Sequence, residues 1–356
     1  MSHLRILAGA RVGSLCLYLL ALSSGCDAIK SVSDTPTEVA TATPEPAAPM
    51  PTPAVPPMPE PMVPKTAQQV IAEFQSLKPI ERQDHHLKAL TELSEGLEAI
   101  QSLDLSRSGI SNEGLSYLPK LSALKELDLT ETRVSNGGMV SVAQVTTLRT
   151  LVLRKIEQVD NTGIQALTSL TNLEDLTIAM LPISDGVMDS IKEMKGLRRL
   201  DVSGNSSLLG QQFSDLVGKG HFTSLRELVV SQTQFGFYGL KQMNKMKELE
   251  IFRAAQCEIV DGAVTGLGGC EALRVLDVAH NKLTDDGIKG INRMKKLEEL
   301  NLSGNQVTNN ALLQFKTMKQ LKKLSLDSTA VTESAVTELK TKFLKETEIQ
   351  VAGKTL

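Results

Sequence analysis

One short apolar phrase, Leu-x-x-Leu-x-Leu, recurs through most of this chain and constrains its fold more than any other feature. Consecutive copies are 24 residues apart, except for one step of 25 and one of 28. Repeats of this length stack side by side, because a single unit is too small to bury its own apolar residues. The copies begin at Ile100, Leu124, Leu148, Leu173, Leu197, Leu225, Leu249, Leu273, Leu297 and Leu321.

Each unit has two kinds of periodicity. The phrase itself alternates apolar and other residues, which is typical of a strand. Apolar residues then recur five, ten and thirteen positions after it, as at Ile110, Leu115 and Leu118, and the last two have the spacing of a helix face. We therefore expect each unit to form one short strand, a turn and a helix.

Polar residues occupy two fixed places in the turns. Three residues after the phrase, a polar column predicts a ladder that satisfies the backbone, and Ile156 and Leu181 interrupt it. Short polar pairs such as Ser111-Asn112 and Thr284-Asp285 precede the helices, where their oxygens can accept hydrogen bonds from free amides. The ladder column contains Ser108, Thr132, Asn205, Thr233, Cys257, Asn281, Asn305 and Thr329.

Residues 100–344 resemble the leucine-rich-repeat family on these phrases. Segments such as Leu283–Ile288 resemble the cysteine-containing repeats of eukaryotic F-box adaptors and a related class common in bacteria, and Cys257 and Cys270 lie where two cysteines of that consensus fall. The resemblance implies an α/β solenoid of about ten repeats, with a curved parallel sheet on the concave side and helices on the convex side. The family has no active site to transfer.

The amino terminus has the pattern of an export signal. Arg5 and Arg11 precede an apolar run, 12–22, that is too short to span a bilayer. The run ends in Leu22-Ser23-Ser24-Gly25-Cys26, which resembles the bacterial lipobox, although Ser23 replaces the usual aliphatic residue. We expect residues 1–25 to be a lipoprotein signal peptide and Cys26 to be lipidated; an ordinary cleaved signal and an uncleaved anchor are the alternatives.

Composition divides the rest of the chain. Residues 30–65 hold eleven of the fourteen prolines, so we expect 26–65 to be a disordered tether, either a stalk or a simple spacer. Fully extended, it would reach on the order of 100 Å. Residues 66–99 have helical spacing and are expected to cap the first repeat, and 345–356 should supply a last strand and tail.

Several functions are disfavoured by composition and motifs. The 38 basic and 41 acidic residues nearly balance, which argues against nucleic-acid binding. We find no hydrolase, zinc-protease or phosphate-loop motif, and we expect no enzyme activity, cofactor, metal or small-molecule substrate. Cys257 and Cys270 are expected to be buried thiols, a disulfide being the alternative. Acidic residues on the strand faces are read as a solvated surface rather than as catalytic groups or calcium ligands: Asp104, Asp128, Asp201 and Asp277.

One place on the predicted concave face differs from the rest. Val229, Ile251, Arg253 and Val275 fall on three consecutive strands, and an exposed aliphatic cluster beside an arginine suits the centre of an interface. Four surplus residues in the unit 205–222 should bulge as a loop, and Phe237 and Tyr238 fall on outward positions nearby. We predict that repeats five to eight bind a protein ligand; ordinary drift of a degenerate repeat is the alternative.

These expectations lead to one main function and two alternatives. The main hypothesis is a non-catalytic protein-binding module, exported and lipid-anchored to a membrane of the bacterial cell envelope. A structural envelope component that self-associates is the first alternative. A substrate adaptor of the ubiquitin-ligase type, suggested by the repeat resemblance alone, is the second.

Overall fold

The computed structural model describes residues 65–356, apart from the side chain of Phe237. The predicted signal peptide, the lipidation residue Cys26 and the predicted tether up to residue 64 lie outside the described residues. None of the helices in the described part of the chain is long and apolar enough to cross a membrane.

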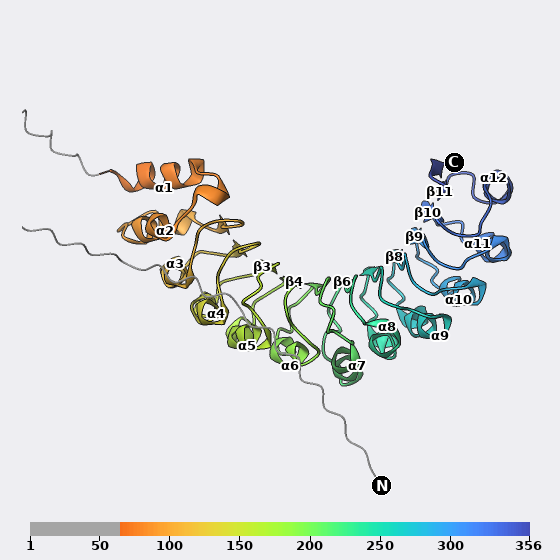
Figure 1. Ribbon diagram of the computed structural model, residues 1–356, viewed down its shortest axis with the longest axis horizontal. Coiled ribbons are helices and arrows are strands. Elements are labelled where there is room, and N and C mark those ends of the chain that lie inside the picture. The colour runs from red at the N-terminus through yellow and green to blue at the C-terminus, as the bar shows by residue number, and fades with distance from the viewer. Residues whose placement is uncertain (1–64) are drawn as a thin grey trace, which may run out of the picture. The chain divides into compact units, whose positions relative to one another are not determined.

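The strands form one sheet in which sequence order and spatial order coincide (Figure 1). The first eleven run parallel, and the last is antiparallel to its neighbour. The central leucine of each phrase pairs with the next, as Leu103 pairs with Leu127, which confirms the predicted parallel stacking. The strands are β1 Ser102–Asp104, β2 Glu126–Asp128, β3 Thr150–Arg154, β4 Asp175–Ala179, β5 Arg199–Asp201, β6 Glu227–Val229, β7 Ile251–Arg253, β8 Val275–Asp277, β9 Glu299–Asn301, β10 Lys323–Ser325, β11 Glu348–Val351 and β12 Lys354–Thr355.

The helices lie on the outer side of the sheet and the strands line the inner side (Figure 1). Several repeats complete their helix with a short 3-10 turn, named η, which the apolar spacing does not distinguish from an α-helix. The helices are α1 Ala67–Ser76, η1 Pro79–Glu81, α2 Asp84–Thr91, η2 Leu97–Ala99, α3 Asn112–Leu115, η3 Leu118–Lys120, α4 Asn136–Val142, α5 Asn161–Ala166, η4 Leu167–Ser169, α6 Val187–Ile191, α7 Gln211–Gly218, α8 Gly236–Gly239, η5 Met243–Lys245, α9 Asp261–Val264, η6 Thr265–Gly269, α10 Asp285–Ile291, η7 Asn309–Ala311, α11 Leu312–Phe315 and α12 Glu333–Lys342.

The leucine columns form a continuous core between sheet and helices, and the polar column forms the expected ladder beside it. Asn281 shows how the ladder works. Its side-chain oxygen accepts hydrogen bonds from the amides of Cys257 and Ile259, and its nitrogen donates to the carbonyls of Ala254 and Val278. A single side chain therefore satisfies the backbone of two repeats where the chain leaves the strand.

A second polar ladder runs along the helix side. The residue at the start of a helix bonds the residue that precedes the next helix, as Asp285 accepts from the amide and hydroxyl of Thr308 at 2.7 and 2.6 Å. Gln211 and Phe237 occupy this position in repeats five and six, and there the ladder is interrupted. Its other members are Asp84, Asn112, Asn136, Asn161, Asp185, Asp261 and Asn309.

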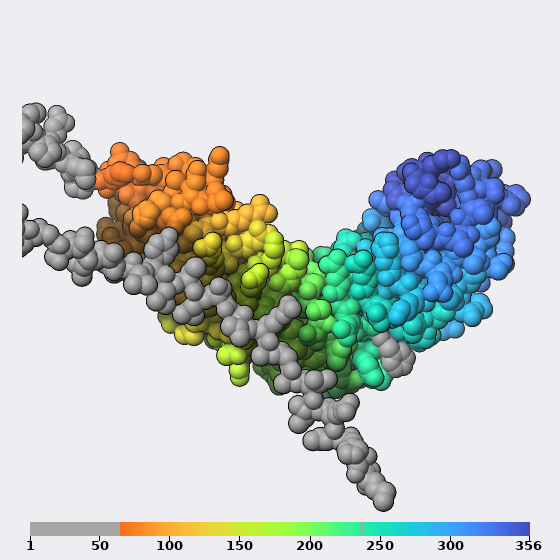
Figure 2. Space-filling view, viewed as in Figure 1, coloured from red at the N-terminus to blue at the C-terminus, as the bar shows by residue number. Residues whose placement is uncertain are grey.

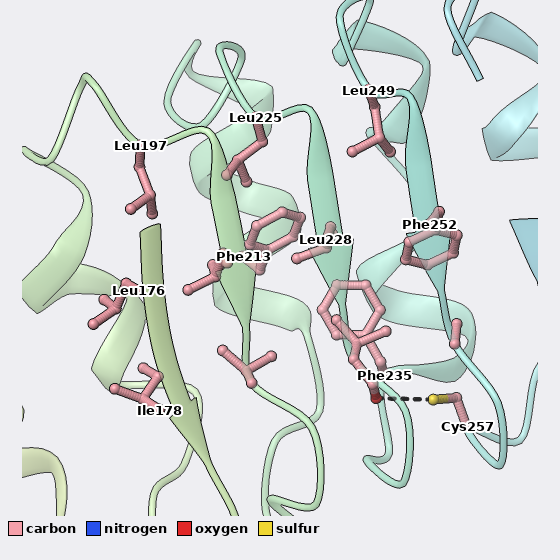
Figure 3. Packing of buried hydrophobic residues seen from close by; sticks show 14 of the residues in the cluster. Leu176, Ile178, Leu197, Phe213, Leu225, Leu228, Phe235, Leu249, Phe252 and Cys257 are labelled. Carbon is pink, nitrogen blue, oxygen red and sulfur yellow. Dashed lines mark hydrogen bonds between the residues drawn. The ribbon is translucent and has the colours of Figure 1, made fainter. Parts of the chain in front are cut away.

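The fifth repeat absorbs its surplus residues without the predicted bulge. Helix α7, with eight residues, is longer than the helices of the neighbouring repeats, and the connection before it, 202–210, is also longer than its counterparts. Phe213 stacks on Phe222 with ring centroids 5.3 Å apart. Phe213 also lies 5.4 Å from Phe235 (Figure 3), so aromatic rings fill the wider space. The surplus residues are thus divided between a longer helix and the connection before it, and the expectation that all four bulge as one loop was wrong.

Both ends of the stack are covered. At the amino end, Leu87 and Leu90 of α2 are buried against the first repeat. Arg82 donates from Nη2 to the carbonyl of Leu77 at 3.1 Å and from Nη1 to the carbonyl of Asp104, at the edge of β1. At the carboxyl end, β11 continues the sheet as expected, and the short hairpin to β12 is an addition that the repeat pattern does not indicate.

Candidate interaction surface on the concave sheet

Two columns of side chains project from the concave face, because each three-residue strand buries its central residue and presents the two beside it. The first column contains the leading residue of each strand and the second its last residue. From β6 to β10 the first column reads Glu227, Ile251, Val275, Glu299 and Lys323, and the second reads Val229, Arg253, Asp277, Asn301 and Ser325.

The structure brings three of the predicted interface residues together on this face. Ile251 and Val275 are direct register partners in the first column, and both are partly exposed. Arg253 lies beside them in the second column. We call Ile251, Val275 and Arg253 the β7–β8 patch.

Val229 does not belong to an exposed cluster. Its exposed fraction is 9%, and its register partners in the second column are Asp201 and Arg253. These long or charged neighbours flank the valine on both sides, so its side chain is covered although its position faces the concave side. The expectation that it is exposed was therefore wrong.

An ion-pair network occupies the concave face from β3 to β7. Arg199 lies at its centre, with Nη1 3.0 Å from Asp175 Oδ1 and Nη2 3.5 Å from Asp201 Oδ2. Arg154 donates to the same Asp201 oxygen at 3.0 Å across one intervening strand. Glu227 extends the network to Arg253, at 4.0 Å. Asp201 is the most enclosed member, because only 3% of its side chain is exposed.

The network changes the charge balance around its central arginine. Burial disfavours the charged guanidinium of Arg199, but Asp175, Glu227 and Asp201 favour it, and the net result is a pKa raised above the ordinary value for arginine. Arg199 is thus a permanent cation held by three carboxylates. Because these ion pairs lie within the protein, its charge is already compensated before any ligand binds.

The concave face from β8 to β10 is different. Asp277, Glu299 and Lys323 make no ion pair within 4.0 Å anywhere in the described part of the chain. They border a hollow of about 230 Å³ that also touches Arg253 and Val275 of the β7–β8 patch. Figure 2 shows the inner side of the arc open between the amino-terminal cap and the carboxyl-terminal repeats.

The strand-face aspartates have a structural task. Asp104, Asp128, Asp201 and Asp277 each accept a hydrogen bond from the backbone amide two residues ahead, at 2.7 to 3.1 Å. Within residues 65–356, no group of three or more His, Cys, Asp or Glu side chains is placed to hold a metal ion. These hydrogen bonds hold the turn that follows β1, β2, β5 and β8.

Tyr238 lies on a different side of the molecule from the β7–β8 patch. It belongs to α8, on the outer side of the sheet, where half of it is exposed and the Lys241 ammonium stands 5.0 Å from its ring. Phe237 lies in the same helix, and its side chain is outside the described part of the structure. The six predicted interface residues thus do not form one continuous surface.

Both remaining cysteines are free, buried thiols on different elements of their repeat. Cys257 donates from Sγ to the carbonyl of Val230 at 3.0 Å, where asparagine amides donate in other repeats (Figure 3). Burial raises the pKa of Cys257, and it raises the pKa of Cys270 to about 12. Neither thiol is activated as a nucleophile.

Sequence reasoning placed Asp277 on the strand faces but did not include Asp277, Glu299 or Lys323 in the predicted interface. Their column positions can be read from the repeat, because Glu299 and Lys323 follow Ile251 and Val275 at steps of 24 residues. The repeat does not indicate that these charges lack ion pairs within residues 65–356, whereas those of β3 to β7 have them.

Comparisons with known proteins agree on the architecture. Two family models, both described as leucine-rich repeats, match residues 271–331 and 95–118. An internalin (InlF) from Listeria monocytogenes has a similar structure, with a TM-score of 0.55 and 15% identity over 80% of this chain and 94% of that one. A leucine-rich-repeat protein from Leptospira interrogans gives 0.48 and 18%, over 74% of each chain. At such identities the likeness concerns the fold alone. No curated protein matches the sequence.

Proposed function

Because the chain folds as a leucine-rich-repeat solenoid, an architecture that generally mediates protein–protein interaction and is typically non-catalytic, we propose that it is a membrane-tethered binding module of a bacterial cell envelope. In this proposal Cys26 carries the lipid, residues 26–65 act as the tether, and the concave sheet from β7 to β10 receives a protein ligand.

One observation carries the binding part of the proposal. Ile251 and Val275 form a partly exposed aliphatic pair on the concave face, and Val275 also lines an open hollow. The charged residues beyond them, Asp277, Glu299 and Lys323, have no ion-pair partner within the described chain. Apolar side chains at the centre and polar groups around them are the usual anatomy of an interface. The ion-pair network of β3 to β7 offers no comparable set, since its charges are already paired.

The binding part is tested by capturing partners from an envelope extract with the wild type and with Ile251→Glu/Val275→Glu. A matched control, Val140→Glu/Leu313→Glu, places the same charges on exposed apolar residues of the outer helices, which are 55% and 59% exposed. We expect the concave variant to lose at least about tenfold in recovery, equivalent to about 1.4 kcal/mol, while the control retains it.

Circular dichroism of both variants verifies that they are folded. Equal recovery by the folded concave variant would exclude this surface, and recovery of only further copies of the chain would instead indicate a self-associating structural component.

The anchor is tested separately by labelling with radioactive palmitate in a bacterial host. We expect label in the wild type and none in Cys26→Ser, together with release of the variant from the membrane fraction. Label that persists in Cys26→Ser would contradict lipidation at this residue.

A further inference from the structure

On the concave surface from β7 to β10, apolar and charged side chains follow one another in a fixed order. A segment that binds there would need complementary side chains in the same order. Along the first column, successive strands offer Ile251, Val275, Glu299 and Lys323. The order is therefore apolar, apolar, acidic and basic.

The spacing of this column matches an extended peptide laid across the strands. Neighbouring strands are about 4.8 Å apart, so Glu299 lies about 7 Å, and Lys323 about 12 Å, from the midpoint between Ile251 and Val275. In an extended chain, side chains on one face are about 6.7 Å apart, which puts the second and third of them about 7 and 13 Å from the first. Three alternate side chains of one segment can thus meet the aliphatic pair, the acid and the base in turn.

The second column strengthens the acidic position. Asp277 follows Val275 by two residues on β8, and Val275 pairs with Glu299 on β9, so both carboxylates border the same hollow. The Asp277 carboxylate keeps one oxygen on the amide of Ala279 at 3.1 Å, and neither it nor Glu299 forms an ion pair within 4.0 Å among residues 65–356. Two carboxylates that lack such a pair favour a basic side chain in the ligand.

We propose that the surface recognises an extended segment of the pattern apolar-x-basic-x-acidic, with the apolar side chain on Ile251 and Val275, the basic one on Glu299 and Asp277, and the acidic one on Lys323. This specificity rests on the proposed binding function and adds the chemistry and direction of the ligand. The opposite charge order, apolar-x-acidic-x-basic, would place like charges together at both positions.

Two synthetic peptides of identical composition test the order: Gly-Leu-Ser-Arg-Ser-Glu-Gly and Gly-Leu-Ser-Glu-Ser-Arg-Gly, both blocked at their ends and fluorescently labelled. Fluorescence anisotropy with the full chain carrying Cys26→Ser measures both affinities at low salt. We expect the first peptide to bind at least about threefold more tightly, since its charges meet opposite charges on the protein whereas those of the second peptide meet like charges.

Exchanging the two charges on the protein should reverse the preference. In Glu299→Lys/Lys323→Glu, the second peptide should become the tighter ligand. The matched control Asp286→Lys/Lys289→Glu exchanges an ion pair on the exposed surface of α10 and conserves net charge, so it should behave as the wild type.

The outcomes separate this inference from the proposed function. If the concave surface captures a partner but the charge exchange changes neither capture nor peptide preference, the inference is wrong and the binding function stands. If neither peptide binds and capture does not depend on Ile251 and Val275, both are wrong.

Discussion

Two stretches of one sheet use the same repeat positions in opposite ways. From β3 to β7, Arg154, Arg199 and Asp201 belong to a network that links all five strands. From β8 to β10, Asp277, Glu299 and Lys323 occupy the same columns without ion pairs in the described chain. The repeat fold thus accepts different side chains in its concave columns. The two stretches differ in whether oppositely charged side chains lie close enough to form ion pairs.

The comparison also separates stability from recognition. Removing one member of a partly buried ion pair leaves the other charge partly buried and without a counter-ion. Substitutions in the β3–β7 stretch are therefore expected to lower the stability of the protein. An unpaired surface charge has no such partner. Substitutions in the β8–β10 stretch should therefore change the stability of the protein little, although they weaken the binding of its ligand.

The largest expected difference is between Asp201→Asn and Asp277→Asn. Both aspartates follow the central leucine of a strand, and both accept from the amide two residues ahead, at 2.9 and 3.1 Å. Asp201→Asn removes the carboxylate that holds Arg154 and Arg199 and should lower the free energy of unfolding by about 2 kcal/mol, discounted because both arginines are partly exposed. Asp277→Asn should cost less than about 0.5 kcal/mol.

Urea unfolding followed by circular dichroism measures both values on the same protein. Equal losses in the two variants would break the comparison, because they would show that the shared turn hydrogen bond, and not the network, accounts for the stability.

The sequence predicts the scaffold well because the scaffold is periodic. Leu103, Leu127 and the eight later central residues mark every strand from β1 to β10, and the ladder column marks where most of these strands end. Each such residue depends only on its own repeat and the next, so a fixed step is sufficient to place it.

The surface is less predictable because its contacts skip repeats. Arg154 reaches Asp201 over 47 residues, across an intervening strand, and no period of 24 indicates that reach. Val229 shows the consequence, since its position in the repeat predicts exposure but its neighbours cover it. The left-handed backbone of some turn residues is also not predictable from the sequence. Arg107, Glu131 and Lys155 adopt this conformation, whereas only a glycine at these positions would have indicated it.

A second prediction asks what holds the β8–β10 repeats together if their concave charges do not. The helix-side ladder supplies this link, and Asp285→Ala removes two hydrogen bonds to Thr308 together with an acidic residue at the start of α10. We expect a loss of about 1–2 kcal/mol in the free energy of unfolding. The adjacent Asp286→Ala also removes a first-turn acidic residue and the exposed pair with Lys289, but no hydrogen bond to the next repeat, and should change stability by less than about 0.5 kcal/mol. Equal losses in the two variants would show that the helix-side ladder does not stabilise these repeats and that the leucine core alone holds them together.

The smallest expected effect concerns Glu298, at the edge of the β8–β10 stretch. It tests whether the ion pairs of this carboxylate lower its pKa. Hydrogen bonds from Arg274 and Lys322 lower the pKa of Glu298 to about 2, whereas the adjacent Glu299 makes no ion pair within 4.0 Å in the described chain. A lowered pKa in the folded state adds stability above the ordinary carboxyl pKa, and this contribution is lost as pH falls from there through about 2.

Carboxyl NMR titration should therefore find Glu298 still ionised well below the ordinary pKa of a glutamate. Arg274→Met/Lys322→Met should move the Glu298 midpoint up toward that ordinary value, and salt should do so in part because the pairs are solvent-accessible. If Glu298 in the wild type titrates at the ordinary value, then the pairs seen around it do not persist in solution, and the distinction between paired and unpaired charges would hold only for the enclosed network around Asp201.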